Sequence, residues 1–167
     1  MQTTKTSPSD SLATSLRPAQ VRWTRLASNR QTLNQSQPYN SVDPFRVPTV
    51  FVVDDDPEMR ESLELLLLAE TFRVETHESA DAFWKVFQPD QRGCVILDLR
   101  MPGMDGLDLL ERLAEHDHGL SVIVVSASAD RGEKLRAKEL GAIDFFGKPY
   151  DIQKLLATIR EQLSQYK

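Results

Sequence analysis

The chain has 167 residues, of which 40% are apolar and 27% are charged, and its net charge is −5. These values are typical of a globular domain, and the apolar runs are far shorter than the roughly 18 residues that a membrane span needs. The single cysteine, Cys94, excludes an intramolecular disulfide, and one cysteine with three histidines gives no zinc-type ligand cluster. Cys94 begins an apolar run, so we expect a small buried hydrophobe rather than a reactive thiol.

Residues 1–47 differ in composition from the rest of the chain. They are rich in Ser, Thr, Gln, Asn and Pro without a sustained apolar pattern, which predicts a disordered, polar and basic N-terminal extension. Their Ser- and Arg-rich, acid-poor composition also loosely fits an organellar transit peptide. Residues 1–48 hold six basic and two acidic side chains, a net of +4, so the remainder carries −9. A domain this acidic is not expected to bind nucleic acid directly.

The first half of the domain predicts three strands and two helices. Residues 50–53 form an unbroken apolar run, which is typical of a strand buried on both faces of a parallel sheet. Pro57 suits the first position of a helix, and apolar residues follow it at helical spacing. Residues 73–76 are a shorter strand candidate, expected near an edge of the sheet. Ser79 can cap a second helix, and a second buried strand is predicted at 95–97.

The second half continues the alternation. Leucines at helical spacing predict a helix near 107–113, and the apolar run 122–125 predicts another buried strand. A charged helix is expected at 131–140, where a glycine follows as a stop signal. Residues 144–146 are a short strand candidate, and an apolar stripe indicates a last helix over 152–163. Five strands alternating with five helices predict an α/β fold with a doubly wound parallel sheet.

Carboxylates follow two of the predicted buried strands. Asp54, Asp55 and Asp56 come directly after the first, and Asp98 comes directly after the third strand in chain order. If these strands are neighbours, each pair of carboxylates about 5 Å apart repels by roughly 3 kcal/mol at an effective dielectric of about 20. Such a cluster must protonate or bind a cation, and oxygen ligands favour Mg²⁺. Taken alone, the first three acids could instead complement a helix dipole, and Asp98 could start a turn.

Two further polar residues lie at strand ends. Ser126 ends the fourth apolar run and Lys148 follows the last strand candidate. Ser126 alone could be a helix cap, and Lys148 alone could be a solvated loop residue. Carboxylates, a metal ion, a hydroxyl and an ammonium group around Asp98 together suit phosphoryl chemistry, in which positioning and charge neutralisation do most of the work.

Four segments then carry a resemblance to a known family. VFVVDDDPEMR, VILDLRMPGMDGLDLL, VVSASAD and GAIDFFGKPYD occur in this order and are similar to the receiver (CheY-like) domains of two-component response regulators. The resemblance is strongest to receivers of the LuxR-type, FixJ-like group. It covers residues 48–166, so the chain divides into the extension 1–47 and a receiver domain 48–167. It implies a five-stranded sheet with the flavodoxin-like order 2-1-3-4-5 and five helices.

The resemblance also implies roles for the strand-end residues. Asp98 would be the phosphoacceptor, and Lys148 would be the lysine that accompanies it in the family. Mg²⁺ would be held by Asp54, Asp55 and Asp98 together with the backbone carbonyl of Arg100.

Further roles concern switching. Ser126 and Phe145 would be the switch hydroxyl and the switch aromatic, and the Lys148–Pro149 bond is often cis in the family. Arg100 and Ser128 occupy positions where the family tunes the lifetime of the phosphoryl group.

The implied function is phosphorelay signal transduction in the cytoplasm. Asp98 would accept a phosphoryl group from a sensor histidine kinase or a histidine phosphotransfer protein, and the surface of the fourth helix, fifth strand and fifth helix would change. The protein would be a phosphoacceptor switch rather than an enzyme, with slow self-dephosphorylation. Its output would be an unknown effector or a phosphorylation-dependent dimer. No contact with a membrane is expected, and no helix-turn-helix follows the last helix.

Two alternatives remain at this point. The domain could act unphosphorylated as an interaction or scaffold module, although Asp54, Asp55, Asp98, Ser126 and Lys148 form a complete set. It could also be a phosphatase with an Asp nucleophile, but those enzymes carry the nucleophile in a DxD motif after the first strand. Here Asp54-Asp55-Asp56-Pro57 is followed by no Thr/Val pair, and no cap insertion is visible.

Overall fold

The computed structural model describes residues 47–127 and 130–166. Within these residues, five strands and five helices alternate along the chain. The strands are β1 (Thr49–Val53), β2 (Val74–His77), β3 (Arg92–Asp98), β4 (Gly119–Ser126) and β5 (Asp144–Gly147). The helices are α1 (Pro57–Ala69), α2 (Ala80–Val86), α3 (Gly106–Ala114), α4 (Arg131–Glu139) and α5 (Ile152–Ser164). The extension predicted for residues 1–47 lies outside the described residues, apart from Val47.

The strands form one parallel sheet in the order β2-β1-β3-β4-β5. This confirms the predicted order and places the two short strands, β2 and β5, at the edges. Val53 of β1 pairs with Leu97 of β3, and Asp98 pairs with Val125 of β4. Asp98, the last residue of β3, and the residues that follow β1 therefore lie side by side at the carboxyl edge of the sheet, where ligands bind in folds of this kind.

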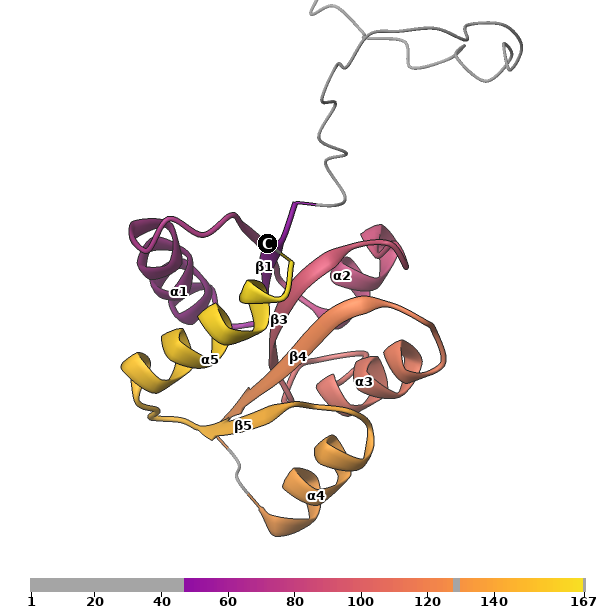
Figure 1. Ribbon diagram of the computed structural model, residues 1–167. Coiled ribbons are helices and arrows are strands. Elements are labelled where there is room, and N and C mark those ends of the chain that lie inside the picture. Colours follow the sequence, from indigo (N-terminus) through magenta and orange to yellow (C-terminus); the bar gives the residue numbers. More distant parts are fainter. Residues whose placement is uncertain (1–46, 128–129, 167) are drawn as a thin grey trace, which may run out of the picture. The chain divides into compact units, whose positions relative to one another are not determined.

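Helices cover both faces of the sheet. Figure 1 shows α1 and α5 on one face and α2, α3 and α4 on the other. Two apolar clusters fill the layers: one packs Leu63, Leu67 and Leu156 against the sheet, and the other packs Phe83 and Leu110 against it. Among the described residues, no helix has the length and apolar character to cross a membrane.

The strands extend beyond the apolar runs that predicted them. β3 begins at Arg92, three residues before the predicted strand, because Arg92 pairs in register with Gly119 of β4. Strand pairing depends on backbone hydrogen bonds as well as on buried side chains, so polar residues at the ends of a run can belong to the strand. Cys94 lies within this extension and is fully buried, and burial raises the pKa of its thiol to about 12.

Local signals set the ends of several helices as predicted. The Ser79 side chain accepts a hydrogen bond from the Ala82 backbone and caps α2. Pro57 occupies the first turn of α1. Gly141, after α4, has a φ of 95°, a backbone conformation that favours glycine, and this explains why the helix ends there.

Candidate phosphoacceptor site

Three carboxylates converge at the carboxyl edge of β1 and β3. Asp54 is 1% exposed and Asp98 is 6% exposed, while Asp55 is exposed. One ligand oxygen from each of the three lies within 4.8 Å of the others. The donor set is all oxygen and partly open to solvent, which fits a hard divalent ion such as Mg²⁺ that keeps several of its waters. The structure therefore brings together the carboxylates that the sequence predicted to share a site.

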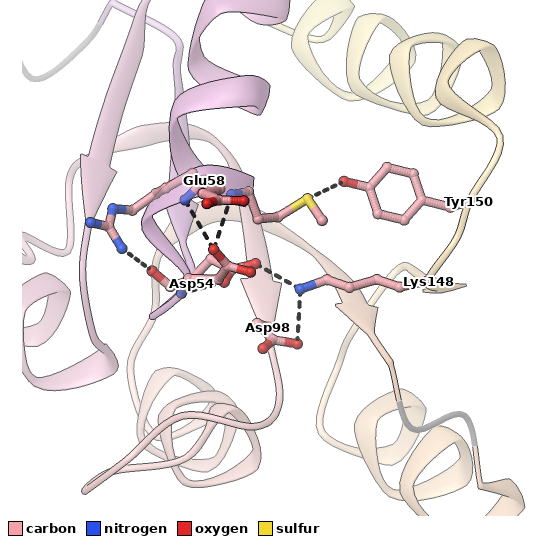
Figure 2. A network of polar contacts seen from close by, with 8 residues as sticks. Asp54, Glu58, Asp98, Lys148 and Tyr150 are labelled. Atoms are coloured by element: carbon pink, nitrogen blue, oxygen red, sulfur yellow. Dashed lines mark hydrogen bonds and ion pairs between the residues drawn. The ribbon is translucent and has the colours of Figure 1, made fainter.

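Hydrogen bonds reach both carboxylate oxygens and the backbone carbonyl of Asp54 (Figure 2). Its Oδ1 accepts a hydrogen bond from the Asp56 backbone at 2.9 Å, and its Oδ2 accepts one from Lys148 Nζ at 2.8 Å. Its backbone carbonyl accepts a hydrogen bond from Arg60 Nη1 at 2.7 Å. A buried carboxylate is tolerated because these donors replace the water that it has lost.

Asp98 is held less firmly than Asp54. Its Oδ1 forms an ion pair with Lys148 Nζ at 3.6 Å, which is too long for a hydrogen bond, and no hydrogen bond reaches this atom within the described part of the chain. Burial raises the pKa of Asp98; the charge of Lys148 opposes this shift, and those of Asp54 and Asp55 add to it. Asp98 is thus a buried carboxylate with an oxygen available for new bonds.

Lys148 lies between the two buried carboxylates and is positioned by the backbone. Its N–H donates to the Ser126 carbonyl at 2.8 Å, and the Lys148–Pro149 bond is cis, as the resemblance implies. Burial alone would lower the pKa of Lys148, but the hydrogen bond to Asp54 and the charges of Asp54 and Asp98 outweigh it, so the pKa is raised. Lys148 therefore stays a cation and neutralises part of the acidic cluster.

Ser126 and Phe145 lie on one face of the sheet. Val124 pairs with Phe145, and Ser126 pairs with Gly147, so Ser126 is two residues beyond the partner of Phe145. Residues two apart on a strand share a face. Ser126 is fully buried at the end of β4, and Phe145 is half-buried against the apolar cluster under α3 and α4. Lys134 Nζ of α4 lies 5.7 Å from the centre of the Phe145 ring.

The other residues that the sequence singled out have mixed outcomes. Asp56 is the N-cap of α1, where its side chain accepts hydrogen bonds from the backbone N–H groups of Glu58 and Met59. It therefore lies at the start of a helix, as the alternative interpretation of the three acids expected, and it also caps that helix. The Arg100 side chain forms an ion pair with Glu133 of α4, and the metal-binding role of its carbonyl stays a prediction. Ser128 lies outside the described residues.

Sequence reasoning missed two residues that support the site. Arg60 donates to the Asp54 carbonyl, and the Tyr150 hydroxyl contacts Met59 Sδ at 3.6 Å across the gap between α1 and the loop after β5 (Figure 2). A cation in the first turn of a helix opposes the helix dipole, and this was the available signal for Arg60. No comparable signal marks Tyr150, because its contact joins residues 91 positions apart.

The geometry is therefore suited to holding an anion that arrives at Asp98. A buried carboxylate oxygen faces a lysine, two further carboxylates can bind a divalent cation, and a serine ends the neighbouring strand. Lys148, together with a divalent cation held by the carboxylates, would stabilise the charge that develops on a transferring phosphoryl group.

Comparison with known proteins agrees with this arrangement. The family model of the response regulator receiver domain matches residues 50–160. Transcriptional regulatory protein FixJ of Azorhizobium caulinodans is 40% identical over 116 residues, which are 70% of this chain and 55% of that protein. Transcriptional regulatory protein TdiR of Thauera aromatica is also 40% identical over 116 residues, covering 70% of this chain and 51% of that protein.

Solved structures give the same result. The FixJ-N crystal structure has a TM-score of 0.63 and 36% identity, with 72% of this chain and 95% of that chain covered. The non-phosphorylated HemR receiver domain of Leptospira biflexa has a TM-score of 0.65 and 31% identity, with 70% of this chain and 94% of that chain covered.

The chain spans about half the length of the curated relatives that it matches, with 55% of FixJ and 51% of TdiR covered. The family model, which matches residues 50–160, extends from β1 into α5. The chain belongs to the response regulator receiver domain family and is a phosphoacceptor switch of two-component phosphorelay signalling.

Proposed function

We propose that Asp98 is the residue that receives the phosphoryl group. The observation that carries this assignment is its buried Oδ1, which faces Lys148 at 3.6 Å, accepts no hydrogen bond from the described residues and lies beside Asp54 and Asp55. Both oxygens of the Asp54 carboxylate already accept hydrogen bonds, one from the Asp56 backbone and one from Lys148. Asp55 is exposed and cannot be shielded from water. Asp98 is the carboxylate best placed to act as a nucleophile.

The proposed reaction is a transfer from nitrogen to oxygen. An Asp98 oxygen attacks the phosphorus of a phosphohistidine, a new O–P bond forms, and the P–N bond breaks as the imidazole leaves with its electron pair. Lys148 neutralises charge on the transferring group. In the slow reverse step, water attacks the phosphorus, the bond between phosphorus and the Asp98 oxygen breaks, and inorganic phosphate leaves while the carboxylate is restored. Asp54, Asp55, Asp98 and the Arg100 carbonyl would hold Mg²⁺, which supplies additional charge neutralisation when bound.

The proposed switch uses Ser126 and Phe145. A phosphoryl dianion on Asp98 requires new hydrogen-bond donors, and Ser126 ends the strand that pairs with β3. Movement of Ser126 toward the phosphoryl group changes the space on the face that it shares with Phe145. Phe145 lies next to α4, so the change reaches the surface formed by α4, β5 and α5.

The remaining expectations stay proposals. The phosphodonor is a sensor histidine kinase or a histidine phosphotransfer protein in the cytoplasm, and the receiver domain occupies residues 48–167. The output is an effector protein or a phosphorylation-dependent dimer. FixJ and TdiR are named transcriptional regulators, but this chain matches only about half of each, so their activity is not transferred to it.

Labelling with acetyl phosphate tests the proposal. The full chain with Mg²⁺ should gain one hydroxylamine-sensitive phosphoryl group, which mass spectrometry should place on Asp98. Asp98→Asn should abolish the labelling, and Asp55→Asn should make it weak at any Mg²⁺ concentration because a metal ligand is lost. Asp105→Asn is the matched control, because Asp105 caps α3 and asparagine caps equally well. Unchanged labelling of Asp98→Asn would refute the assignment.

A further inference from the structure

The inward face of α4 carries a partly buried carboxylate. All nine residues of α4 are described, and only Ala137 among them is buried. Glu133 lies four residues earlier, on the same face of the helix, and its side chain is only 14% exposed. The first turn of α4 therefore turns a carboxylate inward, at a place where a helix usually presents an apolar residue.

Glu133 depends on one cation. Its Oε1 forms an ion pair with Arg100 Nη2, whereas its Oε2 is buried and accepts no hydrogen bond from the described part of the chain. A carboxylate that is mostly removed from water is costly unless it is paired. The position of the first turn of α4 thus depends on the guanidinium group of Arg100.

Arg100 also lies next to the reaction centre. It is two residues beyond Asp98, in the segment that connects β3 with α3, and its side chain is 63% exposed. An exposed guanidinium group can exchange partners at low cost, and it binds phosphate oxygens in the same bidentate way as it binds carboxylates.

We propose that the Arg100–Glu133 pair is a latch that holds α4 in the unphosphorylated position and opens when Asp98 is phosphorylated. This inference rests on the proposed function of Asp98. The new phosphoryl dianion competes with Glu133 for Arg100, and Glu133 is left as a buried carboxylate without a counter-ion. The first turn of α4 then loosens or moves outward to hydrate Glu133, independently of the change at Ser126 and Phe145.

A second ion pair on the same helix provides a contrast. Arg136 of α4 pairs with Glu111 of α3 at 3.1 Å, but both side chains are about half exposed, at 49% and 58%. Exposed pairs of this kind contribute little to stability, because both groups are well solvated when apart. Arg136→Gln is therefore a control in which α4 loses an ion pair between exposed side chains instead of a partly buried one.

The test is a double-mutant cycle of Arg100 and Glu133 in the full chain without a phosphodonor. Amide hydrogen exchange is the quantity measured for each variant. Arg100→Gln should raise exchange over residues 131–139 about fivefold, because it leaves Glu133 partly buried and unpaired. Glu133→Gln should raise it much less, since a neutral amide is easier to bury. The double variant should resemble Glu133→Gln, and Arg136→Gln should resemble the wild type. The amides of β3 and β4 report general destabilisation in the same samples.

Beryllofluoride with Mg²⁺, a mimic of the phosphoryl group, provides the second arm. It should raise exchange over residues 131–139 in the wild type and have a smaller effect in Glu133→Gln, which has no buried carboxylate to release. Three outcomes would overturn the latch: no effect of Arg100→Gln, an equal rise in β3, β4 and α4, or no reversal in the double variant. Failure of wild-type labelling by acetyl phosphate would refute the proposed function. If the wild type is labelled but the effects of Arg100→Gln and Glu133→Gln on exchange simply add in the double variant, the latch alone is refuted.

Discussion

The Asp98 carboxylate lies where its negative charge is unfavourable. Burial raises its pKa, Lys148 only partly opposes this, and Asp54 and Asp55 add to the increase. A carboxyl group with a raised pKa in the folded protein binds its proton more tightly than in the unfolded chain. The contribution of Asp98 to the free energy of unfolding is therefore largest at low pH. It is lost as the pH rises from the ordinary pKa of about 4 through the higher pKa of the folded state. A divalent cation bound by these carboxylates would offset this cost.

Asp98→Asn should accordingly stabilise the protein at pH 7 in the absence of divalent ions. Relief of repulsion from Asp54 and Asp55 predicts a gain in the free energy of unfolding on the order of 1 to 3 kcal/mol. The gain should disappear below about pH 4, where the wild-type carboxyl group is itself protonated. Urea unfolding with a chelator present, compared at the two pH values, measures this difference. Loss of stability at pH 7 would mean that attraction to Lys148 dominates.

The sequence was informative about residues whose position follows from strand ends. Apolar runs locate the ends of β1 and β3, and parallel strands bring those ends to one edge, so Asp54, Asp55 and Asp98 could be predicted as a cluster. Arg60 and Tyr150 could not, because their contacts depend on side-chain conformations and on the approach of α1 to the loop after β5. Such contacts leave no periodic pattern in the sequence.

At the scale of elements, the start of α3 fixes the phosphoacceptor loop. The Gly106 N–H donates to the Leu99 carbonyl at 3.0 Å, which brings the first residue of α3 against the end of β3. A Cβ atom at Gly106 would lie 2.3 Å from the Asp98 carbonyl oxygen and 2.7 Å from Leu99 Cα. Only glycine permits this approach, and both contacts are with backbone that cannot easily move. The sequence predicted this helix from its leucines, but the reason for a glycine at its start required the structure.

Gly106→Ala should therefore destabilise the protein by about 2 kcal/mol, typical of overpacking. It should also reduce acetyl phosphate labelling, because relief of the clash displaces Asp98. Gly132→Ala is the control, since its Cβ would meet only the Asp130 side chain at 3.2 Å and alanine favours a helix by up to about 1 kcal/mol. Urea unfolding and labelling yield measure the two effects. Equal stability of both variants would contradict the close approach inferred at Gly106.

At the scale of the whole domain, the two helical layers present different surfaces. On α4, Leu135 is 59% exposed, and Ile143, just before β5, is 44% exposed. On the opposite face of the sheet, Leu65 of α1 is 63% exposed (Figure 1). Phe145 lies in the α4 and β5 layer and reaches Lys134. Only the surface with Leu135 and Ile143 is connected to the proposed switch, although both layers expose apolar side chains.

Self-association driven by the phosphoryl mimic should therefore use the α4 and β5 surface. Without phosphorylation, the mixed charges of α4 favour specificity over strong affinity, and the chain should be mostly monomeric at micromolar concentration. Beryllofluoride with Mg²⁺ should raise the sedimenting mass, and Leu135→Glu should prevent that increase without a loss of stability, because Leu135 is exposed. Leu65→Glu adds the same charge to the other layer and should leave the increase intact. If beryllofluoride changes neither the sedimenting mass nor amide hydrogen exchange over residues 130–150, the switch does not reach this surface. If Leu65→Glu alone blocks association, α1 forms the contact.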